Sequence, residues 1–225
     1  MVKYSVILPV FRQAKQVERL LKTYLIRLER DLKDYELLFV VNGRPDKSFQ
    51  ILKKLVGKNR QVRVFRLNQS GWGRAVKFGL SRARGQFCGY TNSARTNLDD
   101  LVNILKLSAV NNKYVVKATR ISRESFLRRL GSVIYNLECR FLLKTPQWDI
   151  NGTPKVLPRL ALKKLKLASN GDLIDAELMH KCAKLQIPVV EVPVSLTQRI
   201  EGKSTTNLFS ALKMYLGVLK LRHET

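Results

Sequence analysis

A run of glycines stands where a predicted strand gives way to a helix, and it is the first feature that could do chemistry. Residues 71–74 (GWGR) open the segment, and Gly79 and Gly85 follow. Glycine lets backbone approach a ligand closely, and the N-terminus of a helix favours phosphate. The spacing is neither the dinucleotide fingerprint, which places its glycines after the first strand, nor a P-loop. The segment alone is therefore a weak indication of a phosphate-binding turn.

The charge of the chain is its most unusual bulk property. Its 42 Lys and Arg stand against 17 Asp and Glu, a formal net charge of +25 at pH 7. Such a chain attracts polyanions, whether nucleic acid, nucleotide phosphates, lipid phosphates or an anionic membrane face. A solvated basic surface is the alternative. The three cysteines lie far apart and there are two histidines, which favours neither a metal cluster nor a disulfide framework.

The elements that must position these groups alternate along the chain. Strands are predicted over residues 3–9, 35–41, 61–67, 86–91, 114–118 and 189–194. Helices are predicted over 14–32, 46–55 with Asp46 as its cap, 71–83, 98–108, 122–143 with Ser122 as its cap, 173–185 and 207–221. Strands spaced by helices of this length imply crossover connections and a parallel sheet. The 225 residues fit one large α/β domain better than two small ones.

Polar residues gather where the predicted strands end. In a parallel sheet, ligands bind outside the carboxyl ends of the strands. Those ends are residues 9–11 (PVF), 42–44 (NGR), 68–70 (NQS) and 91–93 (TNS), where we expect a nucleotide-type ligand. The helix at 207–221 is amphipathic, and a packed closing helix is favoured over an interfacial membrane anchor. Its apolar face is predicted to hold Leu208, Leu212, Tyr215, Leu216 and Leu219.

Ordered motifs run through almost the whole chain. They are residues 4–11 (YSVILPVF), 35–46 (YELLFVVNGRPD), 68–85 (NQSGWGRAVKFGLSRARG), 149–155 (DINGTPK), 175–178 (DAEL), 191–194 (EVPV), Arg199 and 202–204 (GKS). The third is similar to an N-x-G-x-G-x-A-x-x-x-G-x-x-x-A-x-G segment. Together they resemble the family-2 glycosyltransferases of GT-A fold, in the branch of dolichol-phosphate mannosyltransferases.

The resemblance covers roughly residues 3–205 and implies a fold. We expect an α/β GT-A (nucleotide-diphospho-sugar transferase) fold, with a mostly parallel central sheet flanked by helices. Residues 1–225 would form a single domain, with a nucleotide-binding half at about 3–118 and an acceptor half at about 119–225 that ends in the amphipathic helix. The implied activity is transfer of a hexose from a nucleotide diphosphate sugar to an acceptor, by inversion.

The resemblance also assigns positions to the nucleotide sugar. Residues 9–11 hold the places of the first-strand loop that contacts the nucleotide. The second-strand turn usually offers acidic groups to the base; here it reads Val41 and Asn42, with Asp46 retained, and Asn42 can still hydrogen-bond a base edge. The expected binding set is Pro9, Val10, Phe11, Asn42, Asp46, Gly71, Gly73, Arg74, Asn92, Ser93 and Arg95.

The main departure from the family follows the fourth strand. There the family has an Asp-x-Asp that holds a divalent metal on the diphosphate, and here the two positions are Asn92 and Ala94. Alanine cannot ligate, and a neutral asparagine oxygen is a poor replacement for a carboxylate on Mg²⁺ or Mn²⁺. Asn92 is therefore a weak metal candidate, and the need for a metal cofactor stays open.

Three explanations of this departure compete. Arg95, with Arg74 expected nearby in the fold, could replace the positive charge of the metal on the diphosphate. The donor site could instead be inactive. In the third, a metal is held by Asp99, Asp100 or Asp149, although acidic residues in a first helical turn are also explained by the helix dipole.

Carboxylates and cations of the second half complete the candidate site. A hydroxyl acceptor must lose its proton, so an inverting transferase needs a carboxylate base, whereas a phosphate acceptor is already ionised. The carboxylate candidates are Asp149, Asp175 and Glu177; the last two could simply supply helix N-terminal charge. Lys155 could meet a phosphate or be a surface lysine. Arg199, Lys203 and Ser204 suit a loop that closes over an anionic ligand, or a solvated linker.

Two functions from different classes remain. The first is a glycosyltransferase whose acceptor, given the charge and the resemblance, is a polyprenyl phosphate or another anionic, membrane-associated molecule. The second is a catalytically silent protein that binds a sugar nucleotide or a lipid phosphate. Nucleic-acid binding is not expected, because no recognition motif or interleaved aromatic pattern is present. We expect a cytoplasmic protein, peripheral at the inner face of the membrane, with no signal peptide and no membrane span.

Overall fold

The computed structural model describes residues 2–93, 95–121, 126–195 and 208–224. Its strands are β1 (Tyr4–Val10), β2 (Tyr35–Asn42), β3 (Val62–Leu67), β4 (Phe87–Tyr90), β5 (Val115–Arg120), β6 (Lys155–Pro158) and β7 (Val189–Val194). Its helices are α1 (Val17–Asp31), α2 (Ser48–Val56), α3 (Trp72–Arg82), α4 (Leu98–Ser108), α5 (Phe126–Leu142), α6 (Arg159–Leu165), α7 (Ile174–Lys184) and α8 (Leu208–Glu224). No helix within the described ranges is long and apolar enough to cross a membrane.

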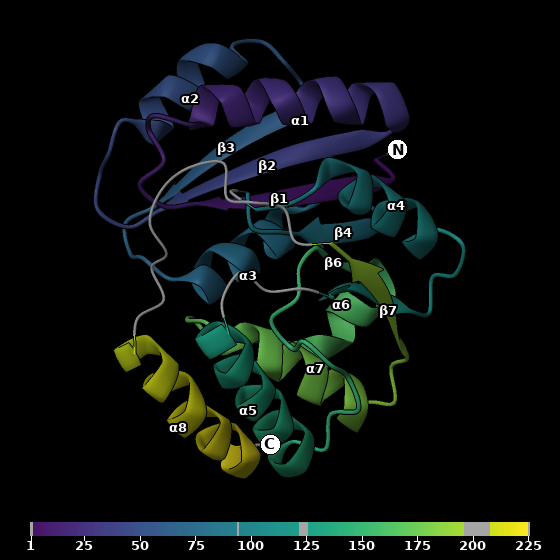
Figure 1. The fold of residues 1–225 in the computed structure, drawn as a ribbon. Helices are drawn as coiled ribbons and strands as arrows, with labels where there is room; N and C mark the ends of the chain where they lie inside the picture. The colour runs from purple at the N-terminus through teal and green to yellow at the C-terminus, as the bar shows by residue number, and fades with distance from the viewer. Residues whose placement is uncertain (1, 94, 122–125, 196–207, 225) are drawn as a thin grey trace.

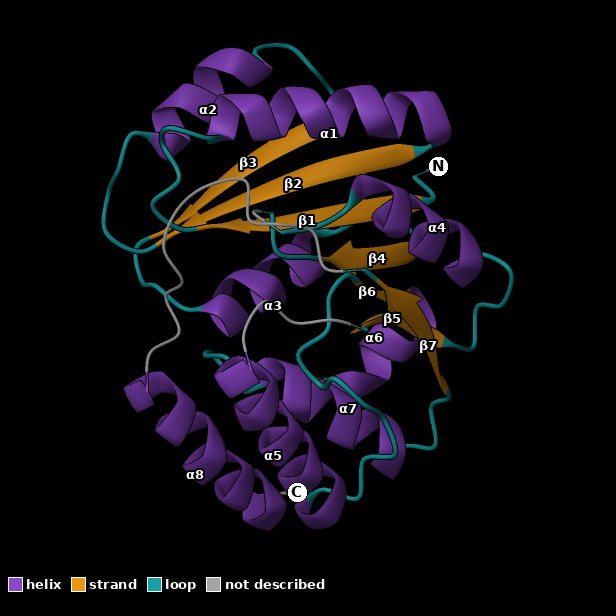
Figure 2. Cartoon of the chain, in the orientation of Figure 1, coloured by secondary structure: helices purple, strands orange, loops and turns teal. Residues whose placement is uncertain are grey.

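One seven-stranded sheet in the order β3-β2-β1-β4-β6-β5-β7 forms the centre of the molecule (Figure 2). Neighbouring strands are parallel except where β6 pairs antiparallel with β4 and with β5. The carboxyl ends of β1, β2, β3 and β4 therefore meet at one edge of the sheet. The architecture is the mostly parallel α/β sheet flanked by helices that the sequence predicted.

Helices cover both faces of the sheet, as Figure 1 shows. Every residue of β1 and β2 is buried, which is the pattern of central parallel strands. Alternate residues of β1 face opposite sides of the sheet. Val6 and Leu8 belong to the hydrophobic core that contains residues of α1, α2 and α4. Ile7 belongs to the core on the other side, which contains residues of α3, α5, α6, α7 and α8. We call these the α1/α4 core and the α3/α7 core. Because both faces are packed, function is confined to the strand ends and the outer helix surfaces.

Most predicted elements are present within a few residues of their expected ends, but one strand and one helix were missed. The unpredicted elements are β6 and α6, which together span residues 155–165. A four-residue strand carries almost no periodicity, and β6 is stabilised by the neighbours β4 and β5 on its two sides. Asp46 was expected to cap α2, but the N-cap residue is Lys47. The Asp46 carboxylate still accepts a hydrogen bond from the Ser48 backbone N–H at 3.1 Å. Ser122 lies outside the described residues.

The apolar face predicted for the last helix is wrong in part. Leu216 and Leu219 are exposed, whereas Val218 and Leu221 are buried in the α3/α7 core. The Tyr215 hydroxyl donates to the Gly131 carbonyl of α5 at 2.7 Å, which fixes the rotation of α8 against α5. The helix carries two apolar stripes, and periodicity alone does not say which one faces inward. As a packed closing helix, α8 agrees with the favoured prediction.

Gly79 lets α3 lie directly on β1, because a Cβ at this position would collide with the Ile7 side chain. We expect Gly79→Ala to lower the free energy of unfolding by about 1–3 kcal/mol, the usual cost of overpacking. Urea denaturation followed by circular dichroism measures it. The matched control is Gly131→Ala in α5, where a Cβ meets nothing within 4 Å and should stabilise the helix by about 0.5–1 kcal/mol. A neutral Gly79→Ala would contradict the packing explanation.

Candidate active site

Asn42 joins three predicted nucleotide-binding segments at the edge where the strands end. Its side-chain amide donates to the Val10 carbonyl at 3.0 Å, and its side-chain oxygen accepts the Gly71 N–H at 3.1 Å. The β4 end joins the same edge, because the Ser93 hydroxyl approaches the Pro9 carbonyl at 3.5 Å. Asn42 is buried, and each group of its amide keeps one more hydrogen-bonding position. The loops after β1, β2 and β4 and the glycine turn therefore form one contiguous site.

The Phe11 ring closes the gap between the first two loops. Gly43 has φ 94°, and a Cβ on it would lie 2.7 Å from the Phe11 ring. Only glycine permits both this backbone conformation and this approach. The ring is partly exposed, and the Arg12 guanidinium lies 5.3 Å from its centroid. An aromatic face is thus held beside Asn42 at the edge of the sheet.

The glycine turn does not present its backbone N–H groups to a phosphate as the sequence predicted. The N–H of Gly73 donates to the Gly171 carbonyl at 3.2 Å, and the N–H of Arg74 donates to the Asn170 carbonyl at 2.9 Å. A Cβ on Gly73 would lie 2.6 Å from the Gly171 carbonyl oxygen. The glycines therefore admit the backbone of residues 169–171, and those carbonyls occupy the helix N-terminus.

Glu177 holds this same 169–171 segment in place. Its carboxylate accepts the backbone N–H groups of Ala168 and Ser169, both at 2.7 Å, and pairs with Lys181 at 2.7 Å. Burial raises the pKa of Glu177, but these donors lower it more, so the pKa lies below its usual value. The side chain predicted as catalytic thus orders the loop that packs on the glycine turn.

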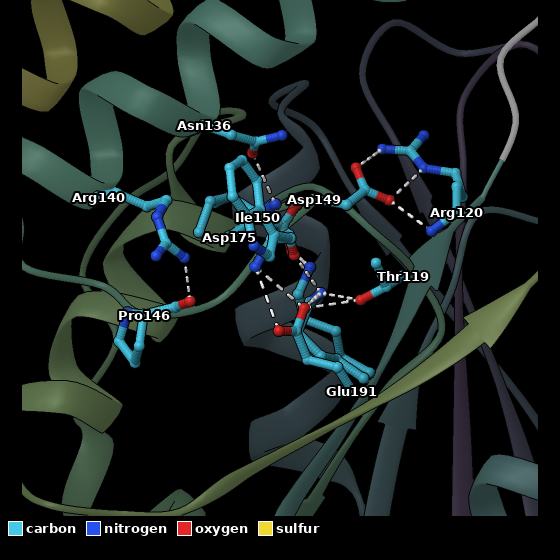
Figure 3. A network of polar contacts seen from close by, with 12 residues as sticks. Thr119, Arg120, Asn136, Arg140, Pro146, Asp149, Ile150, Asp175 and Glu191 are labelled. Atoms are coloured by element: carbon cyan, nitrogen blue, oxygen red, sulfur yellow. Dashed lines mark hydrogen bonds and ion pairs between the residues drawn. The ribbon is translucent and has the colours of Figure 1, made fainter.

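Asp175 is buried within the polar network that Figure 3 shows, and it contacts the glycine motif through Trp72. Its carboxylate accepts the Tyr90 hydroxyl at 2.7 Å and the Trp72 indole N–H at 3.0 Å, and it pairs with the Lys155 ammonium. Lys155 has no exposed surface, so it is not a surface lysine, and burial lowers its pKa. Trp72 comes from the glycine motif and Tyr90 from β4. Asp175 therefore ties the second half of the chain to the strand-end site.

Asp149 is locked to Arg120 at the end of β5 (Figure 3). Oδ2 of the carboxylate accepts Nε of Arg120 at 2.7 Å and its backbone N–H at 2.9 Å, and Oδ1 accepts Nη2 at 2.6 Å. Such a bidentate, charge-assisted pair fixes both side chains. Asp149 itself has φ 45° and is buried. Both carboxylate oxygens are therefore committed to the arginine.

A second buried lysine, Lys117 on β5, was missed by sequence reasoning. Its ammonium donates to the Glu191 carboxylate at 2.9 Å, the Thr119 hydroxyl at 2.9 Å and the Trp148 carbonyl at 2.7 Å. Burial, and then the charge of Lys155, lowers the pKa of Lys117 to about 8. The sequence did contain one indication of this lysine. Glu191 of the EVPV motif is an acidic residue within a predicted strand, and such a residue needs a buried partner.

The lowered pKa of Lys117 predicts a pH-dependent stability. In the unfolded chain its pKa returns to about 10.5, so between pH 8 and 10.5 the unfolded chain binds more protons and stability from this group rises with pH. We expect wild type to gain about 1 kcal/mol relative to Lys117→Met between pH 7 and pH 9. Urea unfolding at both pH values measures the difference. The exposed-lysine variant Lys113→Met should track wild type, and identical pH dependence in all three proteins would contradict the assignment.

Comparison with known proteins identifies the family. Residues 5–165 match the profile described as glycosyl transferase family 2. The chain belongs to glycosyl transferase family 2. It is therefore a glycosyltransferase, as the ordered motifs predicted.

Relatives and solved structures agree with this family. The chain is 24% identical over 240 residues to the dolichyl-phosphate beta-glucosyltransferase of Dictyostelium discoideum, covering 97% of this chain and 73% of that protein. It is 25% identical over 150 residues to the cholesterol galactosyltransferase of Borreliella burgdorferi, covering 67% of this chain and 39% of that protein. Glucosyl-3-phosphoglycerate synthase from Mycobacterium tuberculosis, solved with Mn²⁺, UDP and glucosyl-3-phosphoglycerate, has a TM-score of 0.75 at 18% identity, covering 98% and 80% of the two chains. The fold is thus the GT-A fold.

In this family-2 glycosyltransferase, the two positions that the resemblance assigns to the metal-binding Asp-x-Asp motif are Asn92 and Ala94. Asn92 offers a neutral oxygen, and Ala94 lies outside the described residues. Of the other candidates, Asp99 pairs with Arg27, and the Asp149 carboxylate is held by Arg120. Within the described ranges, no group of three or more His, Cys, Asp or Glu side chains could hold a metal ion.

Two arginines predicted to bind the donor follow β3 and β4 in the sequence, in the glycine turn and after the β4 end. Arg74 is in the first turn of α3, and its Nε is buried with no hydrogen-bond partner among the residues that the structure describes. Arg95 follows β4, where its backbone N–H donates to the Asn92 carbonyl at 3.1 Å. Such an unsatisfied guanidinium atom beside the glycine turn is suited to an anionic ligand. The predicted phosphate contacts Arg199, Lys203 and Ser204 lie outside the described residues.

Proposed function

We propose that this glycosyltransferase moves a hexose from a nucleotide diphosphate sugar, bound at the carboxyl ends of β1, β2 and β4, to a lipid-linked phosphate. The observation that carries the proposal is the junction at Asn42, which joins the β1 end, the β2 end and the glycine turn through its two amide groups. Ligands bind parallel α/β sheets at this edge. The family membership supports the reaction class, and the junction at Asn42 supports this edge of the sheet as the donor site.

The donor is held by groups of three kinds. The remaining hydrogen-bonding positions of Asn42 read the base edge, and the Phe11 ring packs against the base. Arg74, and Arg95 after β4, contact the diphosphate. Because Asn92 and Ala94 stand where the family has two carboxylates, we assign the positive charge that stabilises the departing diphosphate to these guanidinium groups. The supporting observation is the buried Nε of Arg74 that has no partner among the described residues.

The acceptor is inferred from the state of the candidate bases. Each of the three carboxylates predicted as catalytic is paired with a cation: Asp149 with Arg120, Asp175 with Lys155, and Glu177 with Lys181. A carboxylate whose oxygens already contact a cation must give up that contact before it can accept a proton from a hydroxyl acceptor, so it is poorly placed to act as a general base. An acceptor that is already an anion needs no base. The arrangement therefore favours a phosphate over a hydroxyl.

The reaction then proceeds as a single displacement. A phosphate oxygen of the acceptor attacks the anomeric carbon, the bond from that carbon to the diphosphate oxygen breaks, and the nucleotide diphosphate leaves with the electron pair. One displacement inverts the anomeric configuration. The relatives' names fit a lipid acceptor, since one acts on dolichyl phosphate and another on cholesterol. The net charge of +25 fits an anionic acceptor and a place of action at the membrane surface.

A catalytically silent binding protein is the second candidate, and the asparagine at position 92 favours it. Turnover from a panel of UDP- and GDP-hexoses, with polyprenyl phosphate as acceptor and either EDTA or Mn²⁺ present, separates the two. We expect release of nucleotide diphosphate that persists in EDTA. Saturable nucleotide binding without any turnover in either condition would establish the silent protein instead.

A further inference from the structure

The outer face of α5 carries an apolar stripe that nothing in the described structure covers. Its large side chains are 41–83% exposed, with Phe141 the most exposed. At 100° per residue they span an arc of about 100°. The members of the stripe are Leu130, Val133, Ile134, Leu137 and Phe141. Single exposed apolar residues are ordinary, but five on one stripe over three turns mark a contact surface.

This stripe is not the face that α5 uses for folding. Tyr135, Cys139 and Leu143 are buried in the α3/α7 core and lie on the opposite side of the helix. A soluble surface helix is normally polar on the side away from its core. Here both sides of α5 are apolar. Packing against the α3/α7 core explains the buried side, and the exposed side is explained by contact with a binding partner.

The outer face of α8 extends the stripe. The two helices lie side by side in Figure 1, and the Tyr215 hydroxyl on α8 bonds the Gly131 carbonyl of α5. Val218 and Leu221 point into the same α3/α7 core, which leaves Leu216 and Leu219 on the outer side of α8. We call these two leucines and the five α5 residues the α5/α8 face.

Cations border the α5/α8 face. The exposed ones are Arg129 beside the start of the stripe, Lys144 beyond its end, and Lys213 and Lys220 on α8. Glu138, partly buried on α5, is the acidic side chain nearest in sequence to the stripe. An apolar face rimmed by Lys and Arg is the pattern of a helix lying in the interface of an anionic bilayer.

The end of the stripe has the features of a headgroup site. A shallow depression of about 440 Å³ is lined by Leu137, Phe141, Arg140, Lys144, Thr145 and Pro146. The Thr145 hydroxyl is buried and has no hydrogen-bond partner in the described structure. The exposed Trp148 ring stacks 4.4 Å from the Arg140 guanidinium. Tryptophan is enriched at bilayer interfaces, where one end of the ring contacts apolar groups and the other contacts water.

We infer that the α5/α8 face lies on an anionic lipid bilayer, with the apolar stripe in the acyl boundary and the bordering cations among the phosphates. This deepens the proposed function, since it gives the surface by which an enzyme for a lipid-linked acceptor reaches its membrane. Lipid binding is a property of this face alone and needs neither donor nor transfer.

The test is cosedimentation of the full chain with vesicles, without nucleotide. With 30% phosphatidylglycerol in phosphatidylcholine we expect saturable binding that weakens as salt screens the phosphates, and little binding to phosphatidylcholine alone. Leu137→Ser with Phe141→Ser should lower the partition coefficient at least tenfold. The matched control, Ile26→Ser with Val110→Ser, removes two well-exposed apolar side chains from α1 and the turn after α4 and should bind like wild type.

Three results would overturn the inference. The first is equal binding by the stripe variant and wild type when both show native circular dichroism. The second is no binding to anionic vesicles. The third is a concentration-dependent dimer in sedimentation velocity that the stripe variant abolishes, which would assign the face to a second copy. Because the readout is lipid binding, an inactive transferase that still binds vesicles would contradict the proposed function and leave this inference intact.

Discussion

Replacing Asp175 by alanine should lower the free energy of unfolding by about 3–5 kcal/mol, the largest loss of stability we expect from one substitution. The change leaves the Lys155 ammonium, which has no exposed surface, without its counter-ion. The Tyr90 hydroxyl and the Trp72 indole lose their acceptor in the same step. Urea denaturation at pH 7, followed by tryptophan fluorescence and circular dichroism, measures the loss.

Two further variants make this prediction specific. Combining Asp175→Ala with Lys155→Met removes both charges and should recover much of the lost stability, because an apolar replacement of a buried pair is often neutral. Glu18→Ala breaks the exposed helical pair with Lys22 and should change stability very little. A loss below about 1 kcal/mol for Asp175→Ala, or no recovery in the double variant, would mean that the cluster does not hold the two halves together.

Replacing Arg74 by alanine should lower kcat/KM for the donor by about 10²–10³-fold, the usual effect of removing one group that stabilises developing charge. The Nε of Arg74 is buried without a partner among the described residues, so its loss should affect the reaction more than the fold. Arg74→Lys should recover only part of the activity, since an ammonium cannot give the planar, bidentate contact. Initial rates at varied donor concentration and calorimetric binding of the nucleotide diphosphate are the readouts.

Arg82→Ala is the matched control for Arg74. It removes one guanidinium from the last turn of the same helix, where Arg82 lies over the Phe78 ring 5.3 Å from its centroid. The overall charge of the two variants is the same. If only the net charge mattered, both variants would lose kcat/KM equally. Because Arg74 is assigned to the donor and Arg82 is not, we expect the loss in Arg74→Ala alone. Unchanged kcat/KM in Arg74→Ala would remove this arginine from the donor site.

The sequence predicted the framework because its signals are local. Buried runs such as YELLFVV and helices with long apolar periodicity are specified by their own residues, so β2 and α1 lie close to where they were expected. The short strand β6 exists because β4 and β5 pair with it on both sides, and no local pattern encodes that. The meeting of the strand ends near Asn42 could be predicted, because it follows from the topology of a parallel sheet.

The partners of the candidate residues could not be predicted in the same way. Gly73 was read as a place for a phosphate, but the 169–171 backbone, nearly a hundred positions away in sequence, fills it. Lys155 reads as a surface lysine until β6 carries it into the core beside Asp175. Spacing tells which residues share an element, whereas ion pairs between elements depend on how the whole chain packs. The ion pairs of the candidate residues could therefore not be predicted from the sequence, whereas the grouping of the strand ends could.

A phosphate acceptor and a hydroxyl acceptor distinguish the proposed mechanism from one that uses a carboxylate base. Polyprenyl phosphate and the matching polyprenol, presented in the same detergent with the donor that the enzyme uses, differ only in the group that attacks. Because Asp149, Asp175 and Glu177 are each held by a cation, we expect a glycosylated polyprenyl phosphate by mass spectrometry at pH 7 and no product from the polyprenol. Equal glycosylation of the polyprenol would show that a working base exists and would rule out the requirement for a phosphate acceptor.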